Sequence, residues 1–502
     1  MMLLTSLKVF FVAFGLALAT RIVSAFPTPK AATRKTTSSF STVTIDQVGS
    51  SEDFLDPDNG GEASLISPGI QEDDVFDCDD SVSYWKEFKS EGNQVNLQRL
   101  ISTITNEANR DDLGRAYWGS HIIRTGYFTL NAVTGSFASD LHERFIAGRT
   151  DNKDSSDLGL FSKGNGGMLQ NLGNSDIPTR LLLEVFRVYD QDYNYIKQGI
   201  LKFPWDGIIQ RDGRLQLNHR QSNPFFALQE TLGVVRESVA IFSRRYKQSS
   251  KGVFIQRTDP KQSIYPDYYL NDFHYQTDGW FSSESANLYE ASTETLFLGR
   301  QDAMQRQTLI PLLKSGMKPK KILDVASGTG RFGTFLRDNF PTAMVTISDL
   351  SPYYLEKARR NDQYWIKQRG EDAMEEVTGE RKEPEPASFV QANAERLPFE
   401  DNSFDAVTCV YLFHELPADA RQRAAKEMVR VLKPGGMIVL TDSLQLGDRP
   451  PIDKQIGGFS NLNEPHYLNY VNTYLPSLFE GCDCGEKYMA SSTKTISFVK
   501  SQ

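Results

Sequence analysis

The feature that most constrains this chain is the stretch of residues 320–349, where two apolar segments flank a glycine-rich turn and a helix-like run. Residues 322–325 have the composition of a short buried strand, and the helix-like run follows the turn directly. Gly328 and Gly330 lie in the turn, where the lack of a side chain lets the backbone approach a ligand. The second apolar segment ends at Asp349, about 20 residues after the turn, the position of a ribose-binding carboxylate. The order predicts a nucleotide-type βαβ unit.

Two ligands fit such a unit. Residues 328–333 match the dinucleotide pattern G-x-G-x-x-G, and a glycine-rich turn without any ligand is the simplest alternative. Asp324, at the end of the first predicted strand, favours a different ligand. A carboxylate there would repel a pyrophosphate and attract an ammonium or sulfonium group. S-adenosylmethionine carries both of these cations and no phosphate.

The segment Leu323-Asp-Val-Ala-Ser-Gly-Thr-Gly330 resembles the first motif of the class I S-adenosylmethionine-dependent methyltransferases. The similarity is to the broad group that includes ubiquinone and menaquinone methyltransferases, and it extends over about residues 309–499. It implies an α/β fold: a Rossmann-like, seven-stranded class I methyltransferase domain, here preceded by a mostly helical N-terminal region. It also implies S-adenosyl-L-methionine as cofactor and a small-molecule methyl acceptor.

The resemblance further implies which residues bind the cofactor. Asp324 would face the amino group of the methionine part, Asp349 would hold the ribose hydroxyls, and Asn393 would border the adenine. An exposed Asp349 in an ordinary turn is the alternative. The residues assigned to the cofactor in this way are Asp324, Ala326, Gly328, Gly330, Asp349, Leu350, Asn393 and Ala394.

His414 and Glu415 are the predicted catalytic residues. They follow an apolar segment predicted as the fourth strand, at the sheet edge where ligands bind in open α/β proteins. A neutral imidazole there would accept a proton from a phenol or an enol-like carbon near neutral pH. In the alternative, His414 caps the next helix or lines the cofactor pocket. No metal site is predicted, since Cys482 and Cys484 have poor ligand spacing and no nearby partner.

The N-terminus has the pattern of a targeting sequence. In residues 1–25, Lys8 precedes an apolar run that ends in the small residues of a signal-peptidase site, and an uncleaved anchor is the alternative. Residues 26–82 are predicted to be a Ser/Thr-rich transit peptide followed by a disordered acidic linker. The junction Ser24-Ala-Phe-Pro27 resembles the bipartite presequences of algae with secondary plastids. We therefore expect a plastid (chloroplast) protein that enters through a secretory-type signal peptide.

Three further segments complete the predicted organisation. Residues 83–257 are predicted to be a helical region, with three alternative roles: shaping an acceptor pocket, contacting a membrane surface or binding a partner. Residues 258–290 are dense in aromatic residues and are predicted to be either a lid over the cofactor or a strap packed against the core. Residues 291–502 are the methyltransferase domain. The net charge of −9 argues against nucleic acid as a main partner.

Three functions follow from these patterns. The leading hypothesis is a methyltransferase that acts on a small molecule, with a quinone or another plastid metabolite as acceptor. The second is a catalytically silent protein that binds S-adenosylmethionine and serves in assembly or interaction. The third is a nicotinamide oxidoreductase, for which the glycine pattern at 328–333 is the only support.

Overall fold

The computed structural model describes residues 72–88, 93–145, 176–216, 224–247, 264–456 and 463–502. The predicted signal peptide, the transit peptide and most of the acidic linker lie outside the described residues, so the presequence stays a prediction. Among the described residues, no helix combines the length and the hydropathy that a membrane span requires.

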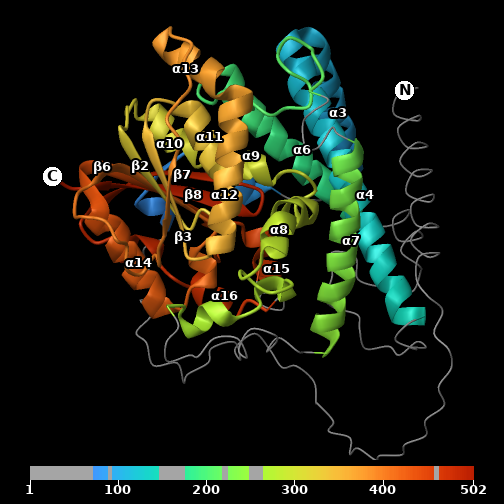
Figure 1. Cartoon of the computed structure of the whole chain (residues 1–502). Coiled ribbons are helices and arrows are strands. Elements are labelled where there is room, and N and C mark those ends of the chain that lie inside the picture. Colours follow the sequence, from blue (N-terminus) through green and yellow to red (C-terminus); the bar gives the residue numbers. More distant parts are fainter. Residues whose placement is uncertain (1–71, 89–92, 146–175, 217–223, 248–263, 457–462) are drawn as a thin grey trace, which may run out of the picture. The chain divides into compact units, whose positions relative to one another are not determined.

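An eight-stranded sheet lies at the centre of the methyltransferase region, with the strand order β1-β7-β8-β6-β5-β2-β3-β4 (Figure 1). Strands β2 to β6 pair in parallel, and β8 is antiparallel to both β6 and β7. The strands are β1 (Asp77–Cys78), β2 (Lys321–Val325), β3 (Met344–Asp349), β4 (Ser388–Gln391), β5 (Phe404–Val410), β6 (Leu432–Ser443), β7 (Cys482–Ala490) and β8 (Thr493–Lys500).

This arrangement confirms the predicted α/β fold and adds one short strand. Seven strands form the expected sheet, and the two-residue β1 pairs in parallel with β7 at its edge. The chain proceeds from β2 to β3 and β4 on one side, then returns to β5 and β6 on the other. The carboxyl ends of β2 and β5 therefore flank a topological switch point, where open sheets of this kind bind ligands.

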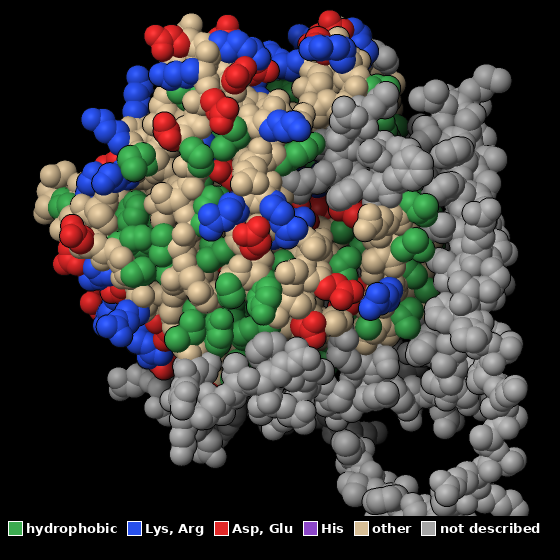
Figure 2. All heavy atoms as spheres, in the orientation of Figure 1, with side chains coloured by type: hydrophobic (Ala, Val, Ile, Leu, Met, Phe, Trp, Pro, Cys, Tyr) green, Lys and Arg blue, Asp and Glu red, His purple; other side chains and the backbone are tan. Residues whose placement is uncertain are grey.

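Helices cover the sheet and follow its strands in the expected order. β2 is buried at Ile322 and Leu323, because parallel strands are enclosed on both faces. On the face shown in Figure 2, acidic and basic side chains interleave. The helices of this region are α8 (Ser283–Leu296), α9 (Gln301–Arg306), α10 (Leu309–Lys314), α11 (Arg331–Asn339), α12 (Pro352–Trp365), α13 (Glu371–Thr378), α14 (Ala418–Val431), α15 (Asp453–Ile456) and α16 (Tyr467–Val471).

The N-terminal region is helical, as predicted, and α4 packs along α3 and α7. The longest helix described in this region, α4, begins at Asp112 and ends at Phe145. Its first half buries polar residues such as His121 and Arg124, which hide the apolar periodicity. The helices are α2 (Asp80–Glu87), α3 (Asn93–Arg110), α4 (Asp112–Phe145), α6 (Asp176–Lys197) and α7 (Pro224–Lys247).

Buried ion pairs join these helices to the methyltransferase sheet. Asp192 on α6 pairs with Arg306 on α9, and both side chains are almost fully buried. Glu184, also on α6, accepts hydrogen bonds from Arg449 at 3.2 Å and from the Ser491 hydroxyl at 2.6 Å. The helical region is therefore part of the same packed unit as the sheet, since residues 64–502 cluster together.

Residues 72–82 depart from the predicted linker because they form ordered elements. Lys487 is 1% exposed, and its ammonium donates to Glu72 at 2.8 Å and to Asp73 at 2.7 Å. Lys494 also pairs with Glu72, at 2.5 Å. A buried ammonium requires such partners. Glu72 and Asp73, which the sequence assigned to a disordered acidic linker, therefore serve as counter-ions to buried lysines.

Candidate cofactor and acceptor site

The turn after β2 places backbone groups against the end of the neighbouring strand. Ala326, Gly328 and Gly330 all have positive φ angles, of 52°, 55° and 69°. The Gly328 amide donates a 2.8 Å hydrogen bond to Asp349 Oδ2, so the turn and the acid at the end of β3 are joined directly. A Cβ on Gly330 would lie 2.7 Å from the Cβ of Ala358, so this glycine allows α11 and α12 to approach closely.

Asp324 is buried beneath this turn with one oxygen unused. It is 1% exposed, and its Oδ1 accepts a 2.7 Å hydrogen bond from the Thr408 hydroxyl on β5. Its Oδ2 has no hydrogen-bond partner among the described residues. Burial raises the pKa of this carboxyl to about 6. A buried acceptor without a partner is suited to a cationic ligand.

Asp349 is held by backbone amides on both oxygens. Oδ1 accepts from the amide of Ser351 at 2.8 Å, and Oδ2 accepts from Gly328. Burial raises its pKa to about 6, while these amide hydrogen bonds lower it. Each carboxylate oxygen can accept a second hydrogen bond, so a ribose diol fits this position without breaking the contacts present.

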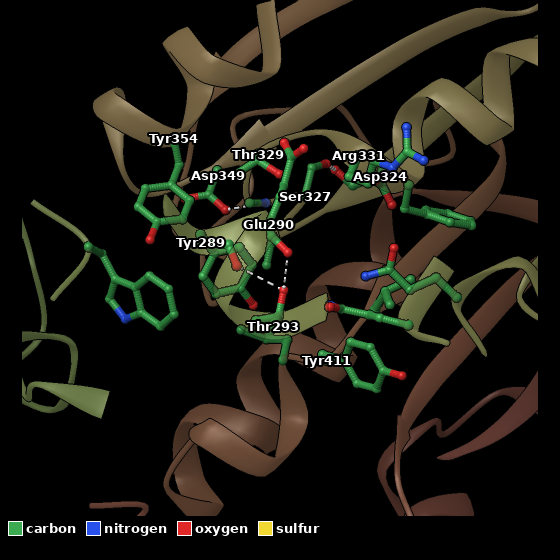
Figure 3. A pocket seen from close by; sticks show the side chains of 18 of the residues that line it. Tyr289, Glu290, Thr293, Asp324, Ser327, Thr329, Arg331, Asp349, Tyr354 and Tyr411 are labelled. Atoms are coloured by element: carbon green, nitrogen blue, oxygen red, sulfur yellow. Dashed lines mark hydrogen bonds between the residues drawn. The ribbon is translucent and has the colours of Figure 1, made fainter. Parts of the chain in front are cut away.

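One pocket connects these residues (Figure 3). Of the eight predicted cofactor residues, seven line it, and Gly330 is the exception because its backbone packs against α12. Glu415 also lines the pocket, whereas His414 is not among the residues that line it. Aromatic residues supply much of the remaining wall: Phe128, Tyr268, Tyr269, Phe273, Trp280, Tyr289, Phe332, Tyr354, Tyr364 and Tyr411.

The N-terminal helical region also reaches this pocket, which agrees with the first of the three roles considered for it from the sequence. Arg124 on α4 and Asp206, in the segment after α6, both line it. Arg331, directly after the glycine turn, pairs with Asp206 at 2.5 Å and with Asp302 at 2.6 Å. Asp302 in turn pairs with Arg124 at 2.7 Å, and the two guanidinium groups hold its pKa well below the usual range. The N-terminal region thus fixes the glycine turn through shared ion pairs.

The aromatic segment lies over the cofactor end of the pocket. Its described part, from residue 264, includes the short 3-10 helices η2 (Asp267–Leu270) and η3 (Phe273–Tyr275). The Tyr268 hydroxyl donates to Glu395 at 2.6 Å, and the carbonyl of Trp280 accepts from the Ser351 hydroxyl at 2.5 Å. This placement suits both a lid and a strap, so the lid stays a prediction.

His414 is paired with an acid at the end of β6. Its Nδ1 lies 2.6 Å from Asp442 Oδ1, and the carboxylate raises the pKa of the imidazole to about 9 against the effect of burial. Burial raises the pKa of the neighbouring Glu415 to about 7. In this environment the imidazolium is favoured over the neutral base that was predicted, and Glu415 is the group closer to its titration point at neutral pH.

The chain matches the family described as a methyltransferase domain over residues 323–440. It is 31% identical over 214 residues to the demethylmenaquinone methyltransferase of Thermus thermophilus, a match that covers 43% of this chain and 83% of that protein. It is also 31% identical over 198 residues to the demethylmenaquinone methyltransferase of Deinococcus radiodurans, with 38% and 71% covered.

The chain belongs to the class I S-adenosylmethionine-dependent methyltransferases. Among solved structures it is similar to the N-methyltransferase NodS from Bradyrhizobium japonicum WM9 in complex with S-adenosyl-l-homocysteine. That similarity has 16% identity and a TM-score of 0.29, and covers 39% of this chain and 86% of the other.

The residues of this methyltransferase fit its cofactor, S-adenosylmethionine. The unpaired Oδ2 of Asp324 matches an ammonium group, and Asp349 matches a ribose diol. Asn393 and Ala394 line the same pocket beyond β4, where the adenine is expected. The dinucleotide alternative fits poorly, because a pyrophosphate at the turn would face the buried Asp324.

Proposed function

We propose that this methyltransferase methylates a small aromatic acceptor of the quinol type. The relatives reported above are named as demethylmenaquinone methyltransferases, and quinols are planar rings with acidic hydroxyl groups. The observation that carries the proposal is the composition of the pocket. It combines the cofactor acids Asp324 and Asp349 with an aromatic wall and with Glu415.

Methyl transfer requires alignment more than activation, because the sulfonium already makes the methyl group reactive. A carbon or oxygen of the acceptor would form a bond to the methyl carbon as the sulfur–carbon bond breaks, leaving a neutral thioether. Aromatic faces such as those of Tyr269 and Trp280 favour the sulfonium by cation–π attraction. Enclosure by the aromatic segment would exclude water from the reacting atoms.

In this proposal, His414 and Glu415 act on the acceptor side. They lie together after β5, and Glu415 reaches the pocket wall while Asp442 holds the imidazole of His414. A hydroxyl of the acceptor would hydrogen-bond to Glu415, whose carboxylate would accept its proton before or during transfer.

Incubation of the purified full chain with methyl-labelled S-adenosylmethionine and a reduced demethylnaphthoquinone tests the proposal. We expect a labelled, methylated quinol from the wild-type protein and none from Asp324→Asn at the same cofactor concentration. A protein that binds S-adenosylhomocysteine but labels neither naphthoquinols nor benzoquinols would refute the quinol assignment.

We also propose that the protein works in a plastid. The support is the predicted presequence alone, in which the signal-like residues 1–25 precede a basic, Ser/Thr-rich stretch. A fluorescent-protein fusion of residues 1–60 should accumulate in plastids of an alga with secondary plastids. Retention of that fusion in the secretory system would refute the proposal.

A further inference from the structure

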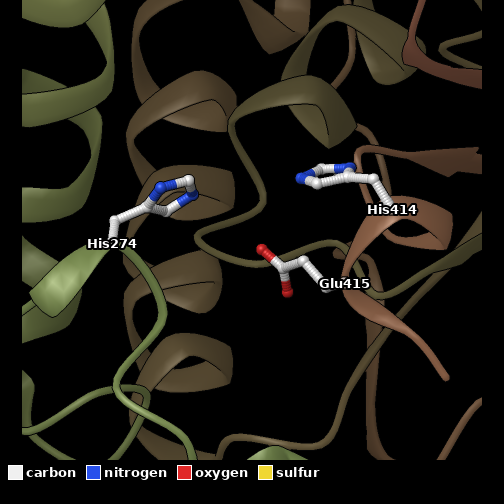
Figure 4. Close-up of side chains that lie close together, drawn as sticks. All are labelled: His274, His414 and Glu415. Atoms are coloured by element: carbon white, nitrogen blue, oxygen red, sulfur yellow. The ribbon is translucent and has the colours of Figure 1, made fainter. Parts of the chain in front are cut away.

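Four potential metal ligands converge beside the acceptor end of the pocket. His274, His414 and Glu415 each offer a ligand atom, and these atoms all lie within 4.8 Å of one another (Figure 4). Glu464 joins them, since its Oε1 is 3.1 Å from His274 Nε2. The four side chains come from three distant segments: η3, η5 (Phe413–Glu415) and the residues just before α16.

One side chain of the cluster, and one ring nitrogen of a half-buried neighbour, are buried without a hydrogen bond to any described residue. The carboxylate of Glu464 is 1% exposed, and neither oxygen forms a hydrogen bond within the part of the chain that the structure describes. His274 Nδ1 is likewise buried without a hydrogen bond to any described residue. Such groups are rare in folded proteins, because an unpaired buried acceptor or charge is costly, and they indicate a bound ion or ligand.

The backbone is strained where it delivers His274. This residue and Tyr275 have φ angles of 54° and 55°, in the left-handed region that side chains other than glycine rarely adopt. The Asn271 side chain donates to the Asn463 carbonyl and accepts from the Asn463 side-chain amide, both at 3.1 Å, which ties the residues before η3 to the segment that carries Glu464. Strain that neighbouring contacts maintain is typical of residues placed for binding.

His414 is oriented as metal-binding histidines are. Its Nδ1 is bonded to Asp442 at 2.6 Å, which leaves the other ring nitrogen to point toward His274 and Glu415 (Figure 4). Asp442 is itself fixed by the amides of Phe413 and Ser443, both at 2.7 Å. A carboxylate that holds the far nitrogen of the ring sets the tautomer and the direction of the free nitrogen.

We propose that His274, His414, Glu415 and Glu464 bind one divalent cation of the Zn²⁺ or Mn²⁺ class. Two imidazoles with carboxylates are donors that suit these ions. Ligand distances of about 2.0–2.2 Å require the donor atoms to draw closer than their present spread when the ion binds. The ion also balances the surplus of buried carboxylate in this cluster.

The role of the ion rests on the proposed function. Glu415 belongs both to the cluster and to the pocket wall, so a bound cation would face the acceptor. With the ion bound, Glu415 is a ligand and no longer a proton acceptor, so the acceptor hydroxyl would lose its proton to solvent and bind the ion as an oxyanion, whose charge the cation stabilises. Methyl transfer then forms the new bond to the methyl carbon and breaks the sulfur–carbon bond. His414 would release the proton of its free ring nitrogen to solvent when the ion binds, and Asp442 would position the ring as a ligand.

Calorimetric titration of chelator-treated full chain with Zn²⁺ and with Mn²⁺, supported by the Mn²⁺ paramagnetic resonance signal, tests the site. We expect one ion per chain, with His274→Ala and Glu464→Gln each weakening the affinity at least tenfold. His466→Ala is the matched control, because this histidine lies in the same segment outside the cluster, and its affinity should match the wild type. All variants should keep wild-type affinity for S-adenosylhomocysteine, which shows that they are folded.

Absence of binding for both ions, or equal affinity in wild type, His274→Ala and Glu464→Gln, would overturn the proposal. Glu464→Gln preserves the size of the side chain, so it decides the matter if His274→Ala fails to fold. The two proposals fail separately. A protein that binds the ion as described but methylates no quinol supports the site and refutes the proposed acceptor.

Discussion

Replacement of Asp324 by Asn removes the charge that faces the cofactor ammonium and keeps the shape of the side chain. The amide oxygen of Asn can still accept the hydrogen bond that the Thr408 hydroxyl donates at 2.7 Å. The substitution therefore acts on the second position of the side chain, where a neutral amide group replaces the carboxylate oxygen Oδ2 that would face the ligand ammonium. A hydrogen bond to a charged group contributes about 1.5–3 kcal/mol, so we expect S-adenosylhomocysteine to bind about 10- to 150-fold more weakly at pH 7.

The wild-type protein should show a pH dependence that the variant lacks. Burial raises the pKa of Asp324 to about 6, and the ligand ammonium prefers the ionised carboxylate. Between pH 7 and pH 5 the ionised fraction falls about tenfold, so the affinity should fall about tenfold with it. The ligand amino group, with a pKa of about 7.7–8.0, stays protonated throughout this range.

Asp324→Asn should lower the affinity for the ligand, but it should raise the free energy of unfolding of the ligand-free protein. The folded-state pKa of Asp324 is raised above its ordinary value of 3.8, so its stabilising contribution is complete at low pH and is lost as pH rises through about 6. Without ligand at pH 7, Asp324→Asn should therefore be more stable, by up to about 3 kcal/mol at 1.36 kcal/mol per pKa unit. Urea unfolding without ligand measures this gain.

Calorimetric titration with S-adenosylhomocysteine at pH 5, 6 and 7 gives the affinities. Asp349→Asn is the matched control, because it should weaken binding to the neutral ribose and keep the pH dependence that Asp324 causes. Wild-type affinity in Asp324→Asn, or a wild-type affinity that does not change between pH 7 and pH 5, would refute the assignment of Asp324 to the ammonium.

Three further predictions concern the glycine turn, the N-terminal helices and the aromatic segment. Gly330→Ala should lower the melting temperature clearly more than Gly316→Ala, because only the first change creates a 2.7 Å contact. The two glycines have the same φ within 1°, and a Cβ at Gly316 would have no described atom within 4 Å. Asp206→Asn removes one acidic partner of Arg331, the partly buried arginine after the turn, and should cost about 1–3 kcal/mol in urea unfolding, whereas Asp212→Asn, in an exposed pair, should have no measurable effect. Tyr268→Phe deletes the hydrogen bond to Glu395 and should raise KM for the acceptor by up to about tenfold with kcat retained, and unchanged kinetics would count against a lid.

Local signals in the sequence predicted cofactor residues that the structure brings, with one exception, to the wall of one pocket. Asp324 and Asp349 lie at the ends of apolar strands, and the turn between them is read from glycine positions, so spacing along the chain fixes their relation. Seven of eight predicted residues line the pocket. Gly330 differs because a ligand approach and a close helix contact both require glycine, and the sequence does not distinguish these causes.

The sequence by itself determined the α/β fold class, through hydrophobic periodicity and glycine turns, and the identity of the cofactor, through motifs of residues close together in the chain that resemble those of the methyltransferases. Only the tertiary structure showed that Arg124 and Asp206 reach the pocket, and that His274 and Glu464 meet beside Glu415. The amino-acid sequence does not distinguish a buried polar side chain from an exposed one. Its function depends on which distant segment supplies its partner, and that is decided by packing.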